Sequence, residues 1–221
     1  NVIEPYLVVK AESSDEDVTS ATQTPESETR YTWGLRAAGK GLFGGGLDYT
    51  VEPNYQSGSS RYTPFGTSQN ENAKENIDAW AIHAEVGYTF KNMPWTPRIG
   101  YAYSFASGDD SFDEGSQKTY KQVSPTQHAH NGYMDVVGWQ NIQDHQFHLN
   151  LKPTKKLVVD VKAHIFELDE ATDNWYNVGG GVARAGADTF VDEFNNNGDS
   201  ATGDVDDELG QEIDVTLKYK M

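Results

Sequence analysis

Residues 78–90 read DAWAIHAEVGYTF, with a hydrophobic or aromatic residue at every second position from Trp80 to Phe90. The positions between them hold small or polar residues, among them His83 and Glu85. Neighbouring side chains of a β-strand point to opposite faces. An alternation with period 2 therefore predicts a strand with one apolar and one polar face.

The same alternation recurs along most of the chain. It is found in residues 31–37, 43–51, 98–105, 146–151, 157–165 and 212–219. Residues 1–12 form a further strand, but the unbroken apolar run from Tyr6 to Val9 leaves its facing open. About eight strands result, each of a length that crosses a bilayer at a tilt. No long segment has the 3.6-residue period of a helix.

The segments between the strands alternate in length. Short links are predicted at 39–41, 91–96 and 153–156, and long polar stretches at 13–29, 53–76, 107–138 and 169–208. A soluble β-sandwich would have turns of similar length every 8–12 residues. Short turns at one end and long loops at the other are typical of an outer-membrane barrel. The predicted fold is therefore all-β, a transmembrane antiparallel β-barrel.

Composition limits the classes of function. The chain has 221 residues, 34 acidic and 17 basic side chains and no cysteine. This acidic balance argues against a nucleic-acid partner, which would need a basic surface, and the lack of cysteine excludes disulfides and thiolate metal sites. There is no run of about 18 apolar residues, which excludes a transmembrane helix. Barrel strands give a weaker hydropathy signal, so a membrane location stays open.

The two faces of such strands would have different surroundings. Every backbone polar group in a bilayer must be paired inside the protein, which closes the sheet. The apolar face would then meet outer-membrane lipid, and the polar face a wet lumen. The candidate lumen residues are Arg36, Arg98, Lys162, Lys218, Glu85 and Asp160. Basic side chains in a pore attract anions, whereas acids on the same face favour the alternative of lumen salt bridges.

Metal binding and catalysis are less well supported. Glu193, Asn195, Asn197 and Asp204 approach the spacing of a calcium loop, although Glu at the first position and Asp at the last depart from that pattern. No other cofactor is predicted. Adjacent acids such as Asp109 and Asp110 are better explained as solvated loop residues, and no nucleophile-and-base arrangement is present. An enzyme is not expected.

Several stretches together resemble the alginate export family of outer-membrane proteins. They are DAWAIHAEVGYTF (78–90), PRIGYAYSFASGD (97–109), NIQD (141–144), LNLKP (149–153), EATDNWY (170–176) and LGQEID (209–214). The resemblance implies a barrel of about eighteen strands that carries an anionic, alginate-like exopolysaccharide outward through a lumen with basic side chains.

Eight strands are too few for such a pore, because a small barrel fills its interior with side chains. The sequence also ends at Lys220-Met221 without the terminal aromatic residue usual in such proteins. Residues 1–221 are therefore expected to be the C-terminal portion of a single larger barrel in a bacterial outer membrane. The long loops would be extracellular, and the short turns and both chain ends periplasmic.

Two other functions remain open. The same fold serves general porins for small solutes, and it also serves structural barrels that anchor a partner such as a cytochrome. The expected partners are therefore lipid, an anionic polysaccharide or small solutes, and periplasmic export or electron-transfer proteins.

Overall fold

The computed structural model describes residues 1–13, 27–41, 45–62, 73–110, 116–124, 130–184, 186 and 206–221. The described elements are all β-strands. The long strands are β1 (Val2–Ser13), β2 (Ser27–Gly41), β3 (Leu47–Tyr62), β4 (Ala73–Thr89), β5 (Arg98–Ala106), β7 (Ile142–Leu151), β8 (Leu157–Glu167) and β11 (Glu208–Tyr219). The short strands are β6 (Ser116–Gln117), β9 (Trp175–Tyr176) and β10 (Val182–Arg184).

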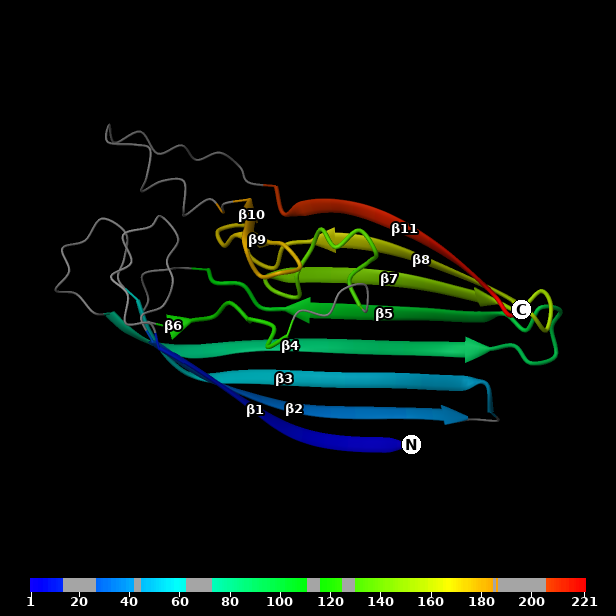
Figure 1. The fold of residues 1–221 in the computed structure, drawn as a ribbon, viewed down its shortest axis with the longest axis horizontal. Coiled ribbons are helices and arrows are strands. Elements are labelled where there is room, and N and C mark those ends of the chain that lie inside the picture. The colour runs from blue at the N-terminus through cyan, green and yellow to red at the C-terminus, as the bar shows by residue number, and fades with distance from the viewer. Residues whose placement is uncertain are drawn as a thin grey trace.

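The long strands form one twisted antiparallel sheet in the order β1-β2-β3-β4-β5-β7-β8-β11 (Figure 1). β6 pairs in parallel with β4, and β9 pairs with β10 in a separate small sheet. Within the described residues, β1 and β11 are the two edges of the large sheet. The predicted antiparallel all-β architecture is confirmed, and closure into a barrel remains a prediction.

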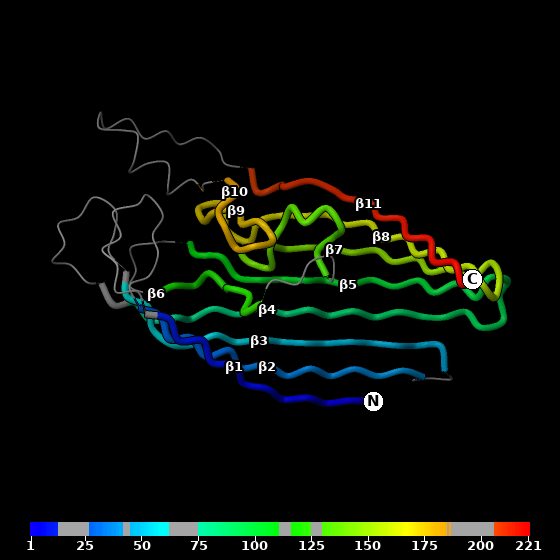
Figure 2. Tube along the Cα trace, viewed as in Figure 1, coloured from blue at the N-terminus to red at the C-terminus, as the bar shows by residue number. Residues whose placement is uncertain are grey.

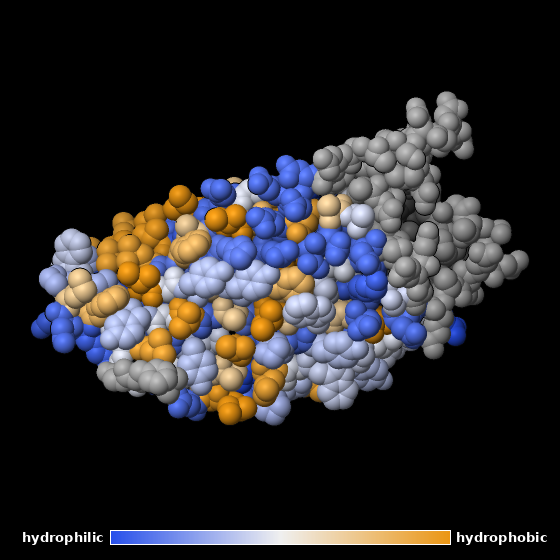
Figure 3. Space-filling view, turned by 180° about the vertical axis from the view of Figure 1, so that it is seen from behind, coloured by the Kyte–Doolittle hydropathy of each residue, from blue (hydrophilic) through white to orange (hydrophobic). Residues whose placement is uncertain are grey.

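One face of the sheet is apolar and exposed. Residues paired across an antiparallel ladder share a face, so Trp80 lies beside Tyr55, and Val86 beside Tyr101. Trp80 is 50% exposed and Ile213, on β11, is 73% exposed. Figure 3 shows this face, with hydrophobic residues across its middle and hydrophilic residues towards its ends. Exposed apolar side chains along successive strands are what a sheet in contact with lipid requires.

The opposite face is called the polar face below. His83 and Glu85 share it, as their alternation with Trp80 predicts. The register also fixes β1, whose facing the sequence left open. Glu4 pairs with Arg36 on the polar face, so Tyr6 and Val8 also lie on that face. Leu7 and Val9 therefore lie on the apolar face.

The predicted alternation of short and long connections is confirmed. Short connections span 42–46, 90–97 and 152–156, and long ones span 14–26, 63–72, 107–141 and 168–207. Both termini lie towards the end of the sheet that carries the short connections (Figure 2). All long connections therefore leave the sheet at its other end.

The short link predicted at 39–41 is wrong, because β2 continues to Gly41. Gly39 pairs with Tyr49 on β3, and the tyrosine ring lies where a Cβ of residue 39 would be. The glycine at position 39 therefore makes room for a ring on the neighbouring strand and does not form a turn.

The long loop predicted at 53–76 is also wrong in its bounds. β3 runs to Tyr62 and β4 starts at Ala73, so the ladder extends well into that stretch. Both faces of this part of β3 carry polar residues, such as Ser57 on one face and Ser60 on the other. The apolar alternation therefore ends before the hydrogen-bonded ladder does. A prediction based on hydrophobicity could not recognise these residues as part of the strands.

The buried hydrophobic cluster lies at the long-loop end of the sheet. It consists of Ala79, Ala81, Ala106, Tyr120, Val137, Ile142 and Phe166. Tyr120 and Val137 belong to the connection between β5 and β7, so part of this connection folds back over the polar face. In the part of the chain that the structure describes, no helix has the length and apolar character needed to cross a membrane.

Candidate functional site

The connection between β5 and β7 covers much of the polar face. Its described residues 116–124 and 130–141 are called the inward segment below. Gln56 on β3 holds one end of it by two hydrogen bonds to the backbone of Lys121. The Lys121 amide donates to Gln56 Oε1 at 3.0 Å, and Gln56 Nε2 donates to the Lys121 carbonyl at 2.6 Å.

The other end of the inward segment reaches the opposite edge of the sheet. The amide of Tyr133 donates to Asp214 at 3.2 Å, and that of Met134 donates to Glu212 Oε1 at 2.9 Å. Both carboxylates belong to β11. The described parts of the inward segment are therefore attached to the polar face at β3 and at β11.

A charged cluster lies beneath the start of the inward segment. Arg30 on β2 is only 1% exposed, and its Nε donates to Glu28 Oε1 at 2.7 Å. Its Nη1 donates to Gln56, while Lys121 of the inward segment lies 3.4 Å from Glu28 Oε2. Burying a charge is costly unless it is paired and hydrogen-bonded, and here both conditions are met.

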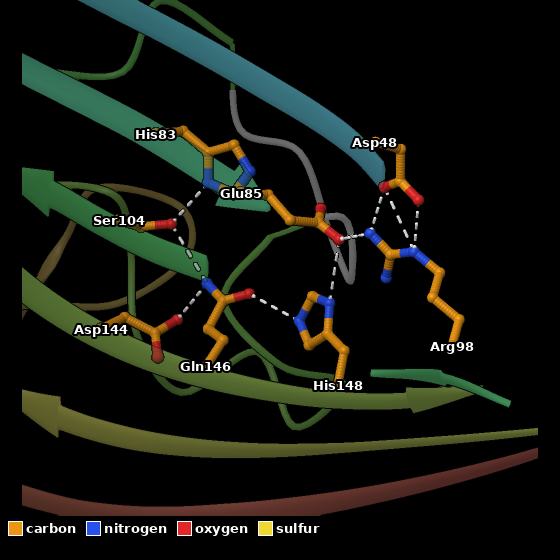
Figure 4. A network of polar contacts seen from close by, with 8 residues as sticks. All are labelled: Asp48, His83, Glu85, Arg98, Ser104, Asp144, Gln146 and His148. Atoms are coloured by element: carbon orange, nitrogen blue, oxygen red, sulfur yellow. Dashed lines mark hydrogen bonds and ion pairs between the residues drawn. The ribbon is translucent and has the colours of Figure 1, made fainter. Parts of the chain in front are cut away.

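The centre of the polar face carries a second ion-pair group (Figure 4). Arg98 donates to Glu85 at 2.7 Å and, through Nε, to Asp48 Oδ2 at 3.0 Å. The guanidinium lies over Gly87, where a Cβ would overlap with it. Glu85 is also within 3.2 Å of His148 Nδ1. The group thus joins β3, β4, β5 and β7.

Gln146 extends this network towards β8. Its amide nitrogen donates to Ser104 at 3.1 Å and to Asp144 at 2.8 Å, and its Oε1 lies 3.2 Å from His148 Nε2 (Figure 4). Asp144 in turn lies 3.0 Å from His164 on β8. A continuous chain of polar contacts therefore crosses the sheet, and its acids and bases largely satisfy one another.

A third polar cluster joins the loops above the sheet. Asp173 is fully buried and accepts four hydrogen bonds, and this arrangement is called the loop clasp below. The donors are the Asp109 amide (3.1 Å), Thr119 Oγ1 (2.6 Å), the Asn174 amide (2.6 Å) and the Tyr176 hydroxyl (2.8 Å). Burial raises the pKa of Tyr176, so this hydroxyl stays protonated at neutral pH. The clasp ties the inward segment to the connection between β8 and β11.

A family model for alginate export matches residues 3–221. The chain belongs to the alginate export family. This confirms the resemblance seen in the sequence and agrees with a sheet that has one apolar and one polar face. A search of curated proteins found no match.

The alginate export family consists of outer-membrane polysaccharide transport proteins, not of enzymes. For a protein of this kind, the basic residues of the polar face bear on the function. Arg98 and Glu85 lie together in one ion pair. Arg36 lies 2.8 Å from Glu4 on β1 and 3.9 Å from Glu52 on β3. Two of the predicted guiding residues are thus held by carboxylates.

The remaining predicted residues lie nearer the β11 edge of the polar face. Lys162 is beside His148 and Asp214 in the register, and Asp160 is beside Thr216. Lys218 is exposed near the end of β11. Within the described ranges, neither lysine has a carboxylate within 4.0 Å, which sets them apart from the two arginines.

Sequence reasoning missed Arg30, Gln56 and the inward segment. Arg30 directly precedes the alternating stretch 31–37 and continues its polar positions, which is a signal that could have placed it on the polar face. Gln56 fell within the predicted loop 53–76. Nothing in the local pattern indicates that the inward segment folds back over the sheet.

The predicted calcium ligands Glu193, Asn195, Asn197 and Asp204 lie outside the described residues. Within the described part of this alginate export family member, no three histidine or acidic residues are grouped as metal ligands.

Proposed function

We propose that the chain forms part of an outer-membrane channel through which an exopolysaccharide passes along the polar face. The observation that carries this proposal is the contrast between the two faces of one sheet. Hydrophobic side chains are exposed on one face, and hydrogen-bonded polar and charged side chains cover the other. Such a sheet can separate lipid from a wet passage.

The proposed orientation follows from the connections. Long connections leave one end of the sheet and short ones the other. In bacterial outer-membrane barrels the long loops are extracellular and the short turns periplasmic. We assign the inward segment and the loop clasp to the extracellular half of the passage on this basis.

The finer proposal is that the cargo is anionic, as the name of the family suggests. Lys162 and Lys218 support it, because they lie on the polar face without a nearby carboxylate in the described residues. Arg36 and Arg98 support it less, because Glu4, Glu85 and Asp48 already neutralise them. We therefore propose the two lysines as the guides for a polyanion.

Planar-bilayer recordings with the full-length protein test this function. A uronate hexamer added to one side should interrupt the current, and an uncharged hexasaccharide of equal length should do so more weakly. If both oligomers pass without any effect on the current, the polysaccharide function is wrong.

A general small-solute porin is the second candidate. The mutual pairing of acids and bases across the polar face favours it, because paired charges select weakly between solutes. The same recordings decide: a porin would conduct small anions, cations and sugars alike and show no block by either hexasaccharide.

A further inference from the structure

Two short connections and the end of β11 come together as one surface of the molecule (Figure 1). The amide of Lys152 donates to the carbonyl of Trp95 at 2.7 Å, which joins the connection after β7 to the connection after β4. The amide of Lys220 donates to the carbonyl of Lys156 at 2.9 Å, which adds the end of β11. The name turn surface is used below for residues 90–97, 152–156 and 219–221.

The turn surface is basic, although the chain as a whole is acidic. The chain has 34 acidic and 17 basic side chains, yet no acidic residue falls within the turn surface. Its basic residues are all exposed, and they are Lys91, Lys152, Lys155, Lys156 and Lys220. None of these lysines has a carboxylate of the described residues within 4.0 Å. Unpaired cations gathered in one place attract an anionic partner.

Exposed apolar side chains lie among these lysines. Met93 is 53% exposed and Trp95 is 57% exposed, so neither is buried by the described chain. Trp95 and Thr96 have positive φ angles of 63° and 46°, which residues other than glycine adopt at a cost in free energy. The amide of Phe90 donates to the carbonyl of Pro97 at 2.9 Å and fixes the shape of the turn. An exposed tryptophan in a costly backbone conformation indicates a contact outside the chain.

The turn surface continues into the apolar face of the sheet. Tyr219 lies on that face two positions after Leu217, and it is 65% exposed. The ammonium of Lys156 lies 6.0 Å from the centre of the Tyr219 ring, a distance at which a cation and an aromatic ring attract each other. A basic side chain therefore lies at the border where the apolar face ends.

This combination favours a lipid headgroup over other anionic partners. Tryptophan and tyrosine are enriched where hydrocarbon meets water, and lysines at that level attract anionic lipids. An acidic periplasmic protein would approach the turns from water, and the exported polysaccharide would approach them from the polar face. Neither accounts for Lys156 beside a ring of the apolar face.

We infer that the turn surface binds anionic phospholipids such as phosphatidylglycerol. Lys155 and Lys156 hold the phosphate group, and Trp95 and Tyr219 lie beside the first carbons of the acyl chains. The inference goes beyond the proposed function, because it concerns the surrounding lipid and not the passage. The proposed orientation enters only where it assigns these lipids to the periplasmic leaflet.

Native mass spectrometry of the full-length protein in detergent measures the Kd of the first bound lipid. The probes are dioleoyl phosphatidylglycerol and dioleoyl phosphatidylcholine, which share their acyl chains and differ in headgroup charge. The wild-type protein should bind phosphatidylglycerol several-fold more tightly. Lys155→Gln combined with Lys156→Gln should raise the Kd of phosphatidylglycerol roughly fivefold or more, the effect of at least one lysine near an anionic membrane surface. The Kd of phosphatidylcholine should not change.

Lys162→Gln combined with Lys218→Gln is the matched control, because it removes the same charge from the polar face. This control should leave the Kd of phosphatidylglycerol unchanged. Equal Kd values for the two lipids in the wild-type protein refute the inference, and so does an equal rise in both double variants.

Bilayer recordings separate this failure from that of the proposed function. A uronate hexamer should block the Lys155 and Lys156 double variant as strongly as the wild type. If this variant is blocked more weakly and its lipid binding is unchanged, the turn surface serves the cargo and the lipid inference is wrong. A wild-type channel that no oligosaccharide blocks refutes the proposed function alone.

Discussion

Arg98 holds two carboxylates on the polar face, and its position depends on Gly87 of the neighbouring strand β4. Gly87 pairs directly with Asp48, and its missing side chain gives the guanidinium room to lie flat across the sheet. Arg98, Asp48 and Glu85 are each less than a quarter exposed. Removal of the Arg98 cation would leave two partly desolvated carboxylates side by side. We therefore expect Arg98 to stabilise the fold and not to bind the cargo.

Arg98→Gln should therefore lower the free energy of unfolding by about 1–3 kcal/mol, between the values for exposed and buried ion pairs. Arg36→Gln is the matched control. Arg36 is 41% exposed and its partner Glu4 is 55% exposed, so its loss should cost about 0–1 kcal/mol. Guanidinium unfolding of the protein in detergent measures both. Equal losses would contradict a structural role specific to Arg98.

Lys162 differs from Arg98, because no carboxylate of the described residues lies within 4.0 Å of it, and it is one of the two lysines proposed to guide a polyanion. Lys162→Gln should weaken block by a uronate hexamer roughly threefold to tenfold, as expected for one charge interaction of about 1 kcal/mol in water. Lys155→Gln changes the net charge equally but lies in a short connection away from the polar face. Bilayer recordings on both variants compare them, and an equal loss of block would assign the effect to net charge.

At the scale of elements, the inward segment is the feature that covers part of the polar face of the sheet. It is held at one end by Gln56 and at the other by carboxylates of β11. The loop clasp at Asp173 adds a third attachment. Each attachment is a hydrogen bond to backbone or to a buried side chain, so the position of the segment depends on a small number of polar groups.

Gln56→Ala removes both hydrogen bonds to Lys121 and should detach that end of the inward segment. The expected results are a higher single-channel conductance and faster proteolysis within residues 116–141, with a local loss of about 1–3 kcal/mol. Gln211→Ala, on the exposed apolar face of β11, should change neither. Unchanged conductance in Gln56→Ala would show that the segment does not narrow the passage.

The loop clasp should respond to alkaline pH through Tyr176. Its pKa is raised above the ordinary value of 10.0 in the folded protein. A raised folded-state pKa means that the stabilisation is complete below pH 10 and is lost as the pH rises further towards the folded-state pKa. Proteolysis of the loops should accelerate only above about pH 10. In Tyr176→Phe this pH dependence should disappear, and its persistence would assign the transition to another group.

At the scale of the whole molecule, the two faces of the sheet decide what surrounds it. Val215 on the apolar face is 61% exposed, while Thr216 beside it belongs to the polar face. Neighbouring positions on one strand thus have opposite surroundings in the membrane. This is the physical basis for treating the sheet as a wall between lipid and a wet passage.

Val215→Arg should destabilise the protein in lipid vesicles by about 2–4 kcal/mol, the cost of a basic residue near the bilayer midplane. Thr216→Arg introduces the same charge one residue further on and should be tolerated. Folding into vesicles, followed by guanidinium titration, compares the two. If Thr216→Arg were the more harmful change, the assignment of the two faces would be reversed.

The period-2 pattern by itself determined the strands, the two faces of all of them except β1, and the alternation of short and long connections. Those features are local, because lipid contact requires an apolar residue at every second position and a turn requires only a few neighbours. The pattern failed at 39–41 and 53–76, where a glycine served ring packing and where the ladder continued beyond the apolar residues.

Only the tertiary structure decided which charges are paired and what covers the polar face. Arg98 and Asp48 are 50 positions apart, and Gln56 and Lys121 are 65 apart. Contacts over such separations depend on the register of several strands and on the path of one long connection. Neither leaves a periodic signal in the sequence, so the ion pairs and the inward segment could be recognised only after the sheet was assembled.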